Sequence, residues 1–184
     1  MKKITLIFLL ICGYTYSQNL VIESGASLTI EKTGSATVGG NFSNSGTVTM
    51  NSDADEFSAI KISGTANGNI TYNRFVNYAA SGEWDLIGSP VDGLSISAFI
   101  NTNTSGTATL ATNGSAFAVG YYDNSTDTWT NYTTGTVGGA GNFDIGKGYQ
   151  MGTVSGGTQI LAFTGSISSS DETQSIINND AANS

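Results

Sequence analysis

Alternating apolar and polar residues mark short segments throughout residues 19–72. Two clear examples are 27–30 (Ser-Leu-Thr-Ile) and 47–50 (Thr-Val-Thr-Met), which lie between Gly, Ala, Ser and Asn residues. Strict alternation over so few residues is typical of a strand with one buried face. The polar residues between the apolar ones, such as Thr49, should then face water. The apolar residues expected to face inward are Leu28, Ile30, Val48, Met50, Ile60 and Ile62.

These segments recur every 8 to 12 residues, which leaves no room for a helix between them. One such strand cannot bury its apolar pair alone, whereas successive strands stacked as rungs bury a continuous column. The pattern therefore favours a β-solenoid-like repeat region over residues 18–72. The alternative is an antiparallel meander with tight turns at 39–40 (Gly-Gly) and 44–46 (Asn-Ser-Gly).

Residues 73–167 are richer in aromatic side chains, and their predicted strands are longer. A turn at Asp123–Asp127 predicts a hairpin in which Tyr121 lies opposite Trp129. Short strands separated by turn residues are typical of a β-sandwich or jelly-roll, so the expected fold class is all-β. The predicted strands cover 74–76, 84–87, 117–122, 128–132, 148–151 and 159–164.

One part of this second region departs from the strand pattern. Leu94–Ile100 is the stretch that fits a helical turn or two, and it follows a predicted turn at 89–93 that contains the single proline. Residues 101–115 consist mainly of Thr, Asn, Ser and Gly, and we expect them to form a loop.

The first residues have the order of a secretory signal peptide. Met1-Lys2-Lys3 is positively charged, residues 4–12 are almost wholly apolar, and small and polar residues follow. The apolar run is too short to span a bilayer. We expect cleavage between Ser17 and Gln18 and a secreted or outer-surface location; lipid modification of Cys12 is the alternative. The expected organisation is a signal peptide (1–17), a β-repeat region (18–72), a β-sandwich-like module (73–167) and a polar tail or the start of a next module (168–184).

Composition excludes several classes of function. Charged residues make up 11% of the chain, the net charge is −8, and histidine is absent. Without histidine the chain cannot form a Ser-His-Asp relay, and with a single cysteine it cannot form a zinc site of the usual His and Cys ligands. The few, scattered basic residues argue against binding to nucleic acid or to an anionic membrane. We expect no cofactor other than weakly bound calcium, and no membrane span in the mature chain.

Two acidic loops are the candidates for such a calcium site. Residues 51–55 (Asn-Ser-Asp-Ala-Asp) and 123–127 (Asp-Asn-Ser-Thr-Asp) carry oxygen-bearing side chains of the kind that hard cations prefer. Neither loop has the glycine and the final acid of an EF-hand, so an ordinary turn with Asx hydrogen bonds is the alternative. The candidate ligands are Asp53, Asp55, Asp123 and Asp127.

Aromatic side chains on the predicted hairpin are candidates for sugar binding. Because the neighbours Tyr121 and Tyr122 point to opposite faces of a strand, one of them should be buried. With Tyr121 and Trp129 assigned to the core, Tyr122 and Tyr132 are the rings expected to stack on a sugar.

Two further patterns have simple structural interpretations. Glu83 and Asp85 form a carboxylate pair, but such pairs arise on any solvated strand face and do not by themselves predict glycoside hydrolysis. Gly146-Lys147-Gly148 lacks the remainder of a phosphate-binding loop, so we interpret it as a tight turn.

Two longer motifs resemble a known group of proteins. Residues 84–91 (Trp-Asp-Leu-Ile-Gly-Ser-Pro-Val) resemble the W-x-L-I-[GS]-S-P-V element of secreted cell-surface proteins of the Bacteroidota, and 143–149 (Phe-Asp-Ile-Gly-Lys-Gly-Tyr) resemble their F-x-x-G-K-G-Y element. The resemblance implies an adhesin-like protein exported by the type IX secretion route. It also implies further C-terminal modules in a longer protein.

These observations lead to a ranked set of functions. The first is a non-enzymatic secreted or cell-surface protein, either adhesin-like or a structural stalk segment, whose partners are a polysaccharide or another surface protein. The second is a carbohydrate-binding accessory region of a larger exported enzyme. An autonomous hydrolase ranks last, because no catalytic constellation is recognisable.

Overall fold

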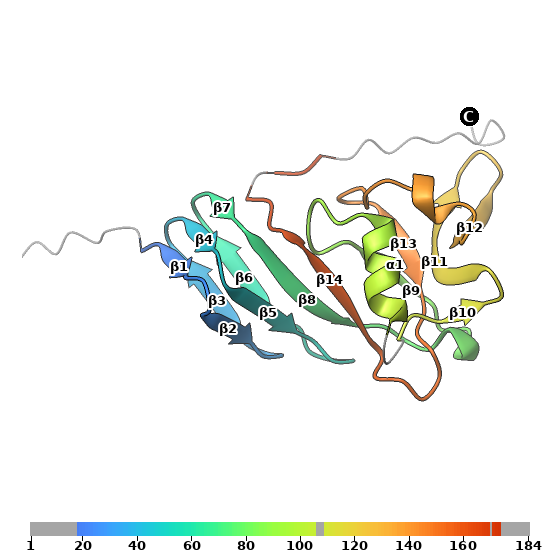
Figure 1. The fold of residues 1–184 in the computed structure, drawn as a ribbon, viewed down its shortest axis with the longest axis horizontal. Coiled ribbons are helices and arrows are strands. Elements are labelled where there is room, and N and C mark those ends of the chain that lie inside the picture. Colours follow the sequence, from blue (N-terminus) through green and yellow to red (C-terminus); the bar gives the residue numbers. More distant parts are fainter. Residues whose placement is uncertain (1–17, 106–108, 170, 174–184) are drawn as a thin grey trace, which may run out of the picture.

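The computed structural model describes residues 18–105, 109–169 and 171–173. The expected signal peptide, with Cys12 and Ser17, lies outside the described residues, as does most of the expected tail. The described chain is mostly β-strand with one α-helix, so the expected all-β class is confirmed. No helix in this part of the chain is long and apolar enough to cross a membrane. The elongated molecule has one region at each end (Figure 1).

Residues 20–75 form the first region. We call it the coil region because its strands wind in successive turns. Its strands are β1 (Leu20–Ile22), β2 (Ser27–Ile30), β3 (Ser35–Val38), β4 (Phe42–Asn44), β5 (Thr47–Asn51), β6 (Ala59–Ile62), β7 (Ala66–Asn67) and β8 (Asn69–Phe75).

Residues 76–166 form the second, which we call the aromatic region. Its elements are the 3₁₀ turns η1 (Ala79–Ser81) and η2 (Val137–Gly139), the helix α1 (Ile96–Thr104), and strands β9 (Asp85–Gly88), β10 (Thr112–Asn113), β11 (Ala116–Asp123), β12 (Thr128–Thr133), β13 (Gly148–Met151) and β14 (Ile160–Ser166).

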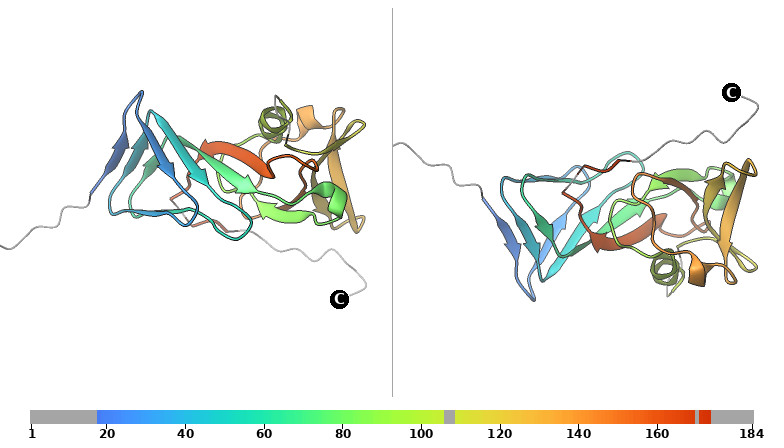
Figure 2. Two further views of the ribbon diagram at one scale, coloured as in Figure 1. Left: turned by 90° about the horizontal axis from the view of Figure 1, so that it is seen from below. Right: turned by 90° about the horizontal axis from the view of Figure 1, so that it is seen from above.

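Strands of the coil region pair in parallel with the third strand along, not with the next one. The ladders are β1–β4–β7, β2–β5–β8 and β3–β6, and paired residues are 20 to 24 positions apart, as in Leu20 with Phe42 and Ser35 with Ala59. Our expectation that successive segments stack on one another was therefore wrong: three successive strands make up one turn of the chain, and the stack continues in the next turn. The parallel pairing also rules out the antiparallel meander. Figure 2 shows the turns in two further views.

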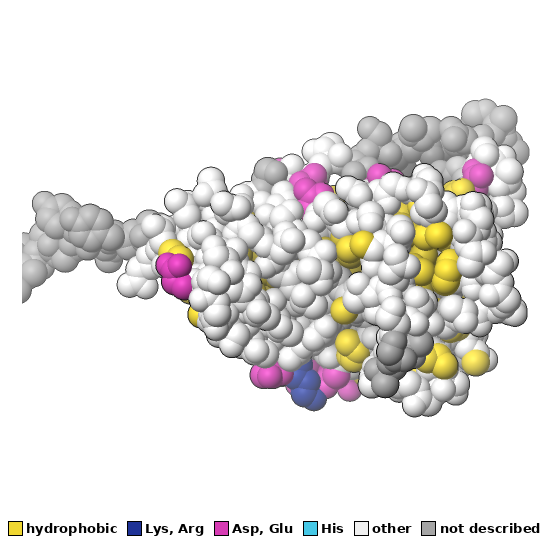
Figure 3. Space-filling view, in the orientation of Figure 1, with side chains coloured by type: hydrophobic (Ala, Val, Ile, Leu, Met, Phe, Trp, Pro, Cys, Tyr) yellow, Lys and Arg dark blue, Asp and Glu magenta, His cyan; other side chains and the backbone are white. Residues whose placement is uncertain are grey.

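Burial in the coil region follows the predicted alternation. Ile30, Val48 and Met50 are buried, and Leu28, Ile60 and Ile62 are partly buried and pack against the same core. The side chains between them point outward, so that Thr29, Thr49, Thr71 and Thr164 lie in register across β2, β5, β8 and β14. In Figure 3 this part of the surface is mainly white, the colour of the backbone and of side chains that are neither hydrophobic nor charged.

Asparagine side chains tie successive turns of the coil together. The Asn73 Nδ2 group donates to Asn51 Oδ1 over 2.9 Å, and Asn51 Nδ2 donates to Glu31 Oε2 over 2.9 Å. At another corner Gly68 has a φ of +93°, and a Cβ there would lie 2.1 Å from the Asn44 carbonyl oxygen. Only glycine permits this close approach between turns.

The two regions share one sheet. β8 pairs in parallel with β5 through residues 71–73 and antiparallel with β14 along its whole length, which gives the order β14–β8–β5–β2. β14, although it is the last described strand, therefore extends the sheet of the coil region. The buried apolar residues of both regions likewise form one continuous cluster.

A second sheet completes the aromatic region: its strand order is β10–β11–β13–β9, and β12 also pairs with β11. The expected helical turns are confirmed and extend further than predicted, because α1 continues through Thr104 into the stretch expected to be a loop. Asn103 explains the extension: its Nδ2 donates to the Ala162 carbonyl and its Oδ1 accepts the Ala162 N–H, so that it pairs with β14.

Between the two sheets and α1 lies an aromatic core. Phe99 of α1 is fully buried and contacts Phe143 at 5.2 Å and Phe163 at 4.7 Å between ring centroids. Tyr149 of β13 packs on Phe143 at 4.9 Å with the rings nearly perpendicular, the edge-to-face geometry that aromatic pairs favour. This core fixes β13 and the loop before it, and that loop forms part of the candidate site.

Candidate functional site: a tyrosine-lined cavity

The hairpin of β11 and β12 differs by one residue from the expected register. Tyr122, not Tyr121, lies opposite Trp129, with ring centroids 5.2 Å apart. A shift of one residue exchanges the two faces of the paired strand. Trp129, which was expected to be buried, is therefore 45% exposed. Tyr132, which was expected to be exposed, is only 9% exposed. Of the two proposed sugar-stacking residues, Tyr122 is exposed as expected, whereas Tyr132 lies beside Tyr121 on the inward face.

Tyr121 and Tyr132 line a cavity of about 500 Å³ at the end of the aromatic core. Their ring centroids are 5.5 Å apart. Tyr149 from β13 also borders the cavity, although it is only 1% exposed, and the loop from η2 to β13 supplies Asp144 and Lys147. The cavity therefore combines three tyrosine rings with one carboxylate and one ammonium group.

Asp144 is held by the residues around it. The Tyr149 hydroxyl accepts the Asp144 backbone N–H over 3.0 Å and donates to Asp144 Oδ2 over 3.4 Å. Lys147 Nζ lies 3.4 Å from the same carboxylate oxygen. This ammonium also lies 5.3 Å from the centroid of Tyr121 and 5.5 Å from that of Tyr149, within the range of cation–π attraction. The two opposite charges therefore form an exposed pair beside two of the tyrosine rings.

Burial raises the pKa of Tyr132 to about 12, and the neighbouring phenols and Asp144 act on it in the same direction. Burial is also the main cause of the raised pKa of Tyr149. Both phenols are therefore neutral at physiological pH. A neutral phenol both donates and accepts a hydrogen bond, which suits a ligand that carries hydroxyl groups.

The Asp123–Asp127 loop is an ordinary turn in this structure. Asp123 Oδ1 accepts the Ser125 backbone N–H over 2.9 Å and the Ser125 hydroxyl over 2.6 Å, and these bonds lower the pKa of Asp123. Asp127 accepts a hydrogen bond from the Tyr122 hydroxyl, and this bond is the main cause of the raised pKa of Tyr122.

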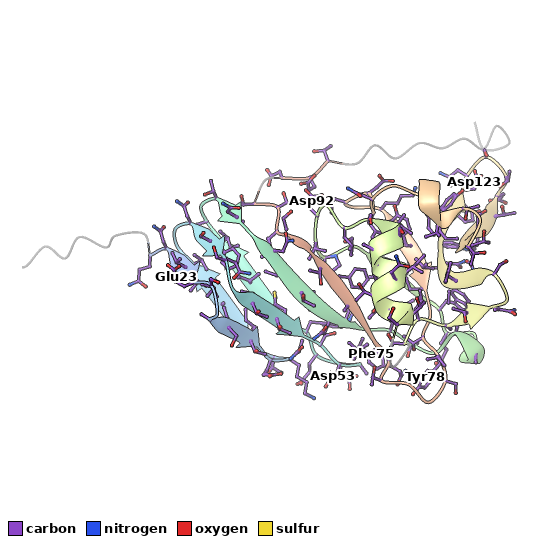
Figure 4. The ribbon with its side chains drawn as sticks, in the orientation of Figure 1. Glu23, Asp53, Phe75, Tyr78, Asp92 and Asp123 are labelled. Carbon is purple, nitrogen blue, oxygen red and sulfur yellow. The ribbon has the colours of Figure 1, made fainter. Side chains whose placement is uncertain are left out.

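The other acidic loop is held in a comparable way. Asp53 forms a salt bridge with Lys32, which lowers the pKa of Asp53, and its Oδ1 accepts the backbone N–H groups of Asp55 and Glu56. Figure 4 shows Asp53 at the lower edge near the middle of the molecule and Asp123 at its upper right, so the two acidic loops lie apart. Among the described residues, no group of three or more His, Cys, Asp or Glu side chains is placed to hold a metal ion.

The two simpler patterns have structural roles. The Asp85 carboxylate accepts the Asn77 backbone N–H over 2.8 Å and the Asn77 Nδ2 group over 3.0 Å, and so joins β9 to the segment after β8. In the Gly146-Lys147-Gly148 segment the Lys147 N–H donates to the Asp144 carbonyl, and Gly146 has a φ of +79°. This tight turn leads directly into β13.

Tyr149 and Asp144 were not predicted as site residues. Both belong to the 143–149 motif, whose other members Phe143 and Lys147 pack against the same phenol. The motif was therefore the signal available in the sequence, but its contribution to a cavity depends on β11 and β12, which supply the facing tyrosines.

Comparison with protein-family models, curated proteins and solved structures finds no significant match to the chain. The resemblance to surface proteins of the Bacteroidota accordingly rests on the two sequence motifs and stays a prediction. The geometry of the cavity is therefore the main guide to function.

Proposed function

We propose that the protein is a non-enzymatic, adhesin-like protein of the cell surface or extracellular space that binds a neutral glycan in the tyrosine-lined cavity. The observation that carries this proposal is the set of three tyrosine rings around one neutralised Asp144–Lys147 pair. Aromatic faces suit the C–H faces of sugars, and carboxylate, ammonium and phenol groups suit their hydroxyls.

The charges of the protein favour an uncharged ligand over an anionic one. The chain carries a net charge of −8, which repels polyanions over long distances, and the lysine in the cavity is already paired with Asp144. A neutral saccharide can exchange hydrogen bonds with the pair without leaving either charge unpaired. An acidic glycan, in contrast, must compete with Asp144 for Lys147.

The cavity offers little for hydrolysis. A glycoside hydrolase of the usual kind needs two carboxyl groups on either side of the scissile bond, and Asp144 is the one carboxylate among the described residues that line this cavity. That carboxylate is also already engaged by the Tyr149 hydroxyl and by Lys147. These features support binding rather than turnover.

The two regions suit different roles, one as a structural support and the other as the part that binds the glycan. We propose that the coil region is a solenoid-like stalk, because three parallel ladders wind with a repeat of 20 to 24 residues. The aromatic region, in which two sheets pack across one core, is the β-sandwich-like recognition module. Export through a signal peptide, and the type IX route in particular, are part of the same proposal and follow from the sequence.

Binding of neutral oligosaccharides tests the proposal. Glucose, mannose and galactose oligomers are titrated against the secreted chain by isothermal calorimetry, and Tyr121→Ala is compared with Tyr122→Ala. The two tyrosines are neighbours, but only Tyr121 lines the cavity. Tyr121→Ala should lower the affinity about tenfold, the size expected when one stacked ring is lost. Tyr122→Ala should bind as the unmodified chain does. Equal losses in both variants, or no binding by the unmodified chain, would contradict the proposal.

A further inference from the structure

We propose that a second cavity, lined by Trp84, Phe117 and several alanines, binds the acetamido group of an N-acetylated amino sugar. This cavity has a volume of about 430 Å³. Asn131 lines both cavities, but their aromatic residues differ: Trp84 and Phe117 line this one, whereas Tyr121, Tyr132 and Tyr149 line the other. The two cavities are therefore neighbours, and variants of their separate aromatic residues test each assignment alone.

Small apolar side chains form the recess of this cavity. Ala79, Ala111 and Ala118 line it, and Ala118 is only 5% exposed. The recess depends on Gly152, because a Cβ at that position would lie 2.6 Å from the Ala79 Cβ. An alanine-lined recess has room for a methyl group and gives it apolar contacts on several sides. The methyl of an acetamido group is the part of an amino sugar that fits this environment.

Two aromatic side chains flank the recess. Trp84 is 37% exposed and comes just before β9, whereas Phe117 is half-buried on β11. An indole ring offers a flat face to the plane of an amide or to the C–H face of a pyranose ring. Ligand binding would account for the exposure of Trp84, because Asp85 and Ile87 already attach this segment to the rest of the fold.

Among the polar groups that line this cavity, the side-chain amide of Asn131 is the hydrogen-bond donor proposed for the acetamido carbonyl. Asn131 Oδ1 accepts a hydrogen bond from Gln150 Nε2, which orients the Asn131 amide and leaves its Nδ2 hydrogens for a ligand. A carbonyl oxygen accepts from such a group. Thr112 and Asn113 line the opposite rim and offer hydrogen bonds to sugar hydroxyls.

Among the described residues that line this cavity, none carries a charge. A free amino sugar carries an ammonium group, which would lose water here without gaining a carboxylate. The acetylated sugar is uncharged and buries its methyl group in the recess. The cavity should therefore distinguish N-acetylglucosamine from both glucosamine and glucose.

The test uses these three sugars as probes for the secreted chain, with binding followed by the fluorescence of tryptophan and by calorimetry. N-acetylglucosamine should bind, and glucose and glucosamine should bind at least about tenfold more weakly, the equivalent of about 1.4 kcal/mol. Trp84→Ala should lower the affinity for N-acetylglucosamine about tenfold. Ala80→Leu, which extends an exposed rim residue toward the recess, should lower it as well.

Two control variants show whether binding occurs at this cavity. Leu86→Ala alters a 66% exposed side chain two residues from Trp84 that does not line the cavity, so it should leave N-acetylglucosamine binding unchanged. Tyr121→Ala, which weakens the tyrosine-lined cavity, should leave it unchanged too. The inference is overturned if glucose binds as well as N-acetylglucosamine, if a correctly folded Trp84→Ala binds normally, or if Tyr121→Ala removes the binding.

Discussion

The coil region and the aromatic region use different means to form a core, and the difference explains where the two proposed binding cavities lie. In the coil region each turn repeats the previous one, so aliphatic side chains such as Ile30 and Met50 fill the interior evenly. In the aromatic region large rings from α1, β13, β14 and the loop before β13 pack together at varied angles, and two of the pairs are nearly perpendicular. Both proposed cavities are lined by residues from Ala79 onward. Regular repetition gives a uniform surface, whereas irregular packing of large rings leaves concave sites.

The largest expected effect concerns the aromatic core. Phe99→Ala removes a fully buried ring that contacts Phe143 and Phe163, so it should lower the free energy of unfolding by about 3–5 kcal/mol. Both tryptophans lie in the aromatic region, so their fluorescence reports on that region, while far-ultraviolet circular dichroism reports on both. We expect the two denaturation curves to coincide, because β8 and one apolar cluster join the regions. Thr102→Ala, on the exposed side of α1, is the matched control. Two separate transitions would show that the regions fold independently.

A smaller effect is expected in the coil region. Met50→Ala removes a side chain that is 2% exposed and should lower the free energy of unfolding by about 2–4 kcal/mol, since a thin core of short strands relaxes more easily around a void. Thr49→Ala, one residue earlier on the outward face, should cost less than about 1 kcal/mol. Chemical denaturation measures both. Similar losses at the two positions would contradict the alternation of buried and exposed residues in β5.

The smallest expected effect is a pH dependence specific to the aromatic region. The pKa of Tyr132 is raised from 10.0 to about 12 in the folded protein. The folded state therefore keeps a proton that the unfolded chain releases above about pH 10, so the stabilisation is complete below that pH and is lost as the pH rises toward 12. The melting temperature should fall over this interval, and it should fall less in Tyr132→Phe, which has no phenol to ionise. Identical slopes for both proteins would mean that burial does not hold this phenol neutral.

Local sequence patterns predicted the strands well but not their pairing. The inward positions Val48 and Met50 follow from alternation alone, because a strand with one buried face can place them in only one way. The partner of each strand depends instead on how many strands complete a turn. Three strands per turn are needed for Leu28 to meet Val48, and no residue within either strand carries that information.

The candidate site was harder to predict because it depends on one residue of register. The turn at Asp123–Asp127 was recognised, yet the ladder begins with Asp123 opposite Thr128, and Asp127 has a φ of +55°. This geometry sends Trp129 outward and Tyr132 inward. The extension of α1 escaped prediction for a similar reason: Asn and Thr favour helices poorly, and Asn103 is held in α1 by its contact with a strand about sixty residues later.

The winding of the coil region gives the molecule a unit of length. One turn uses 20 to 24 residues and adds one strand to each ladder it crosses. Because neighbouring strands are about 4.8 Å apart, duplication of a single turn would lengthen the molecule by that distance. The new turn would present the same edges to its neighbours, so β8, β14 and both cavities would keep their internal geometry. The length of the molecule can thus change through the number of turns in the coil region, and its binding specificity can change separately through the aromatic residues that line the cavities.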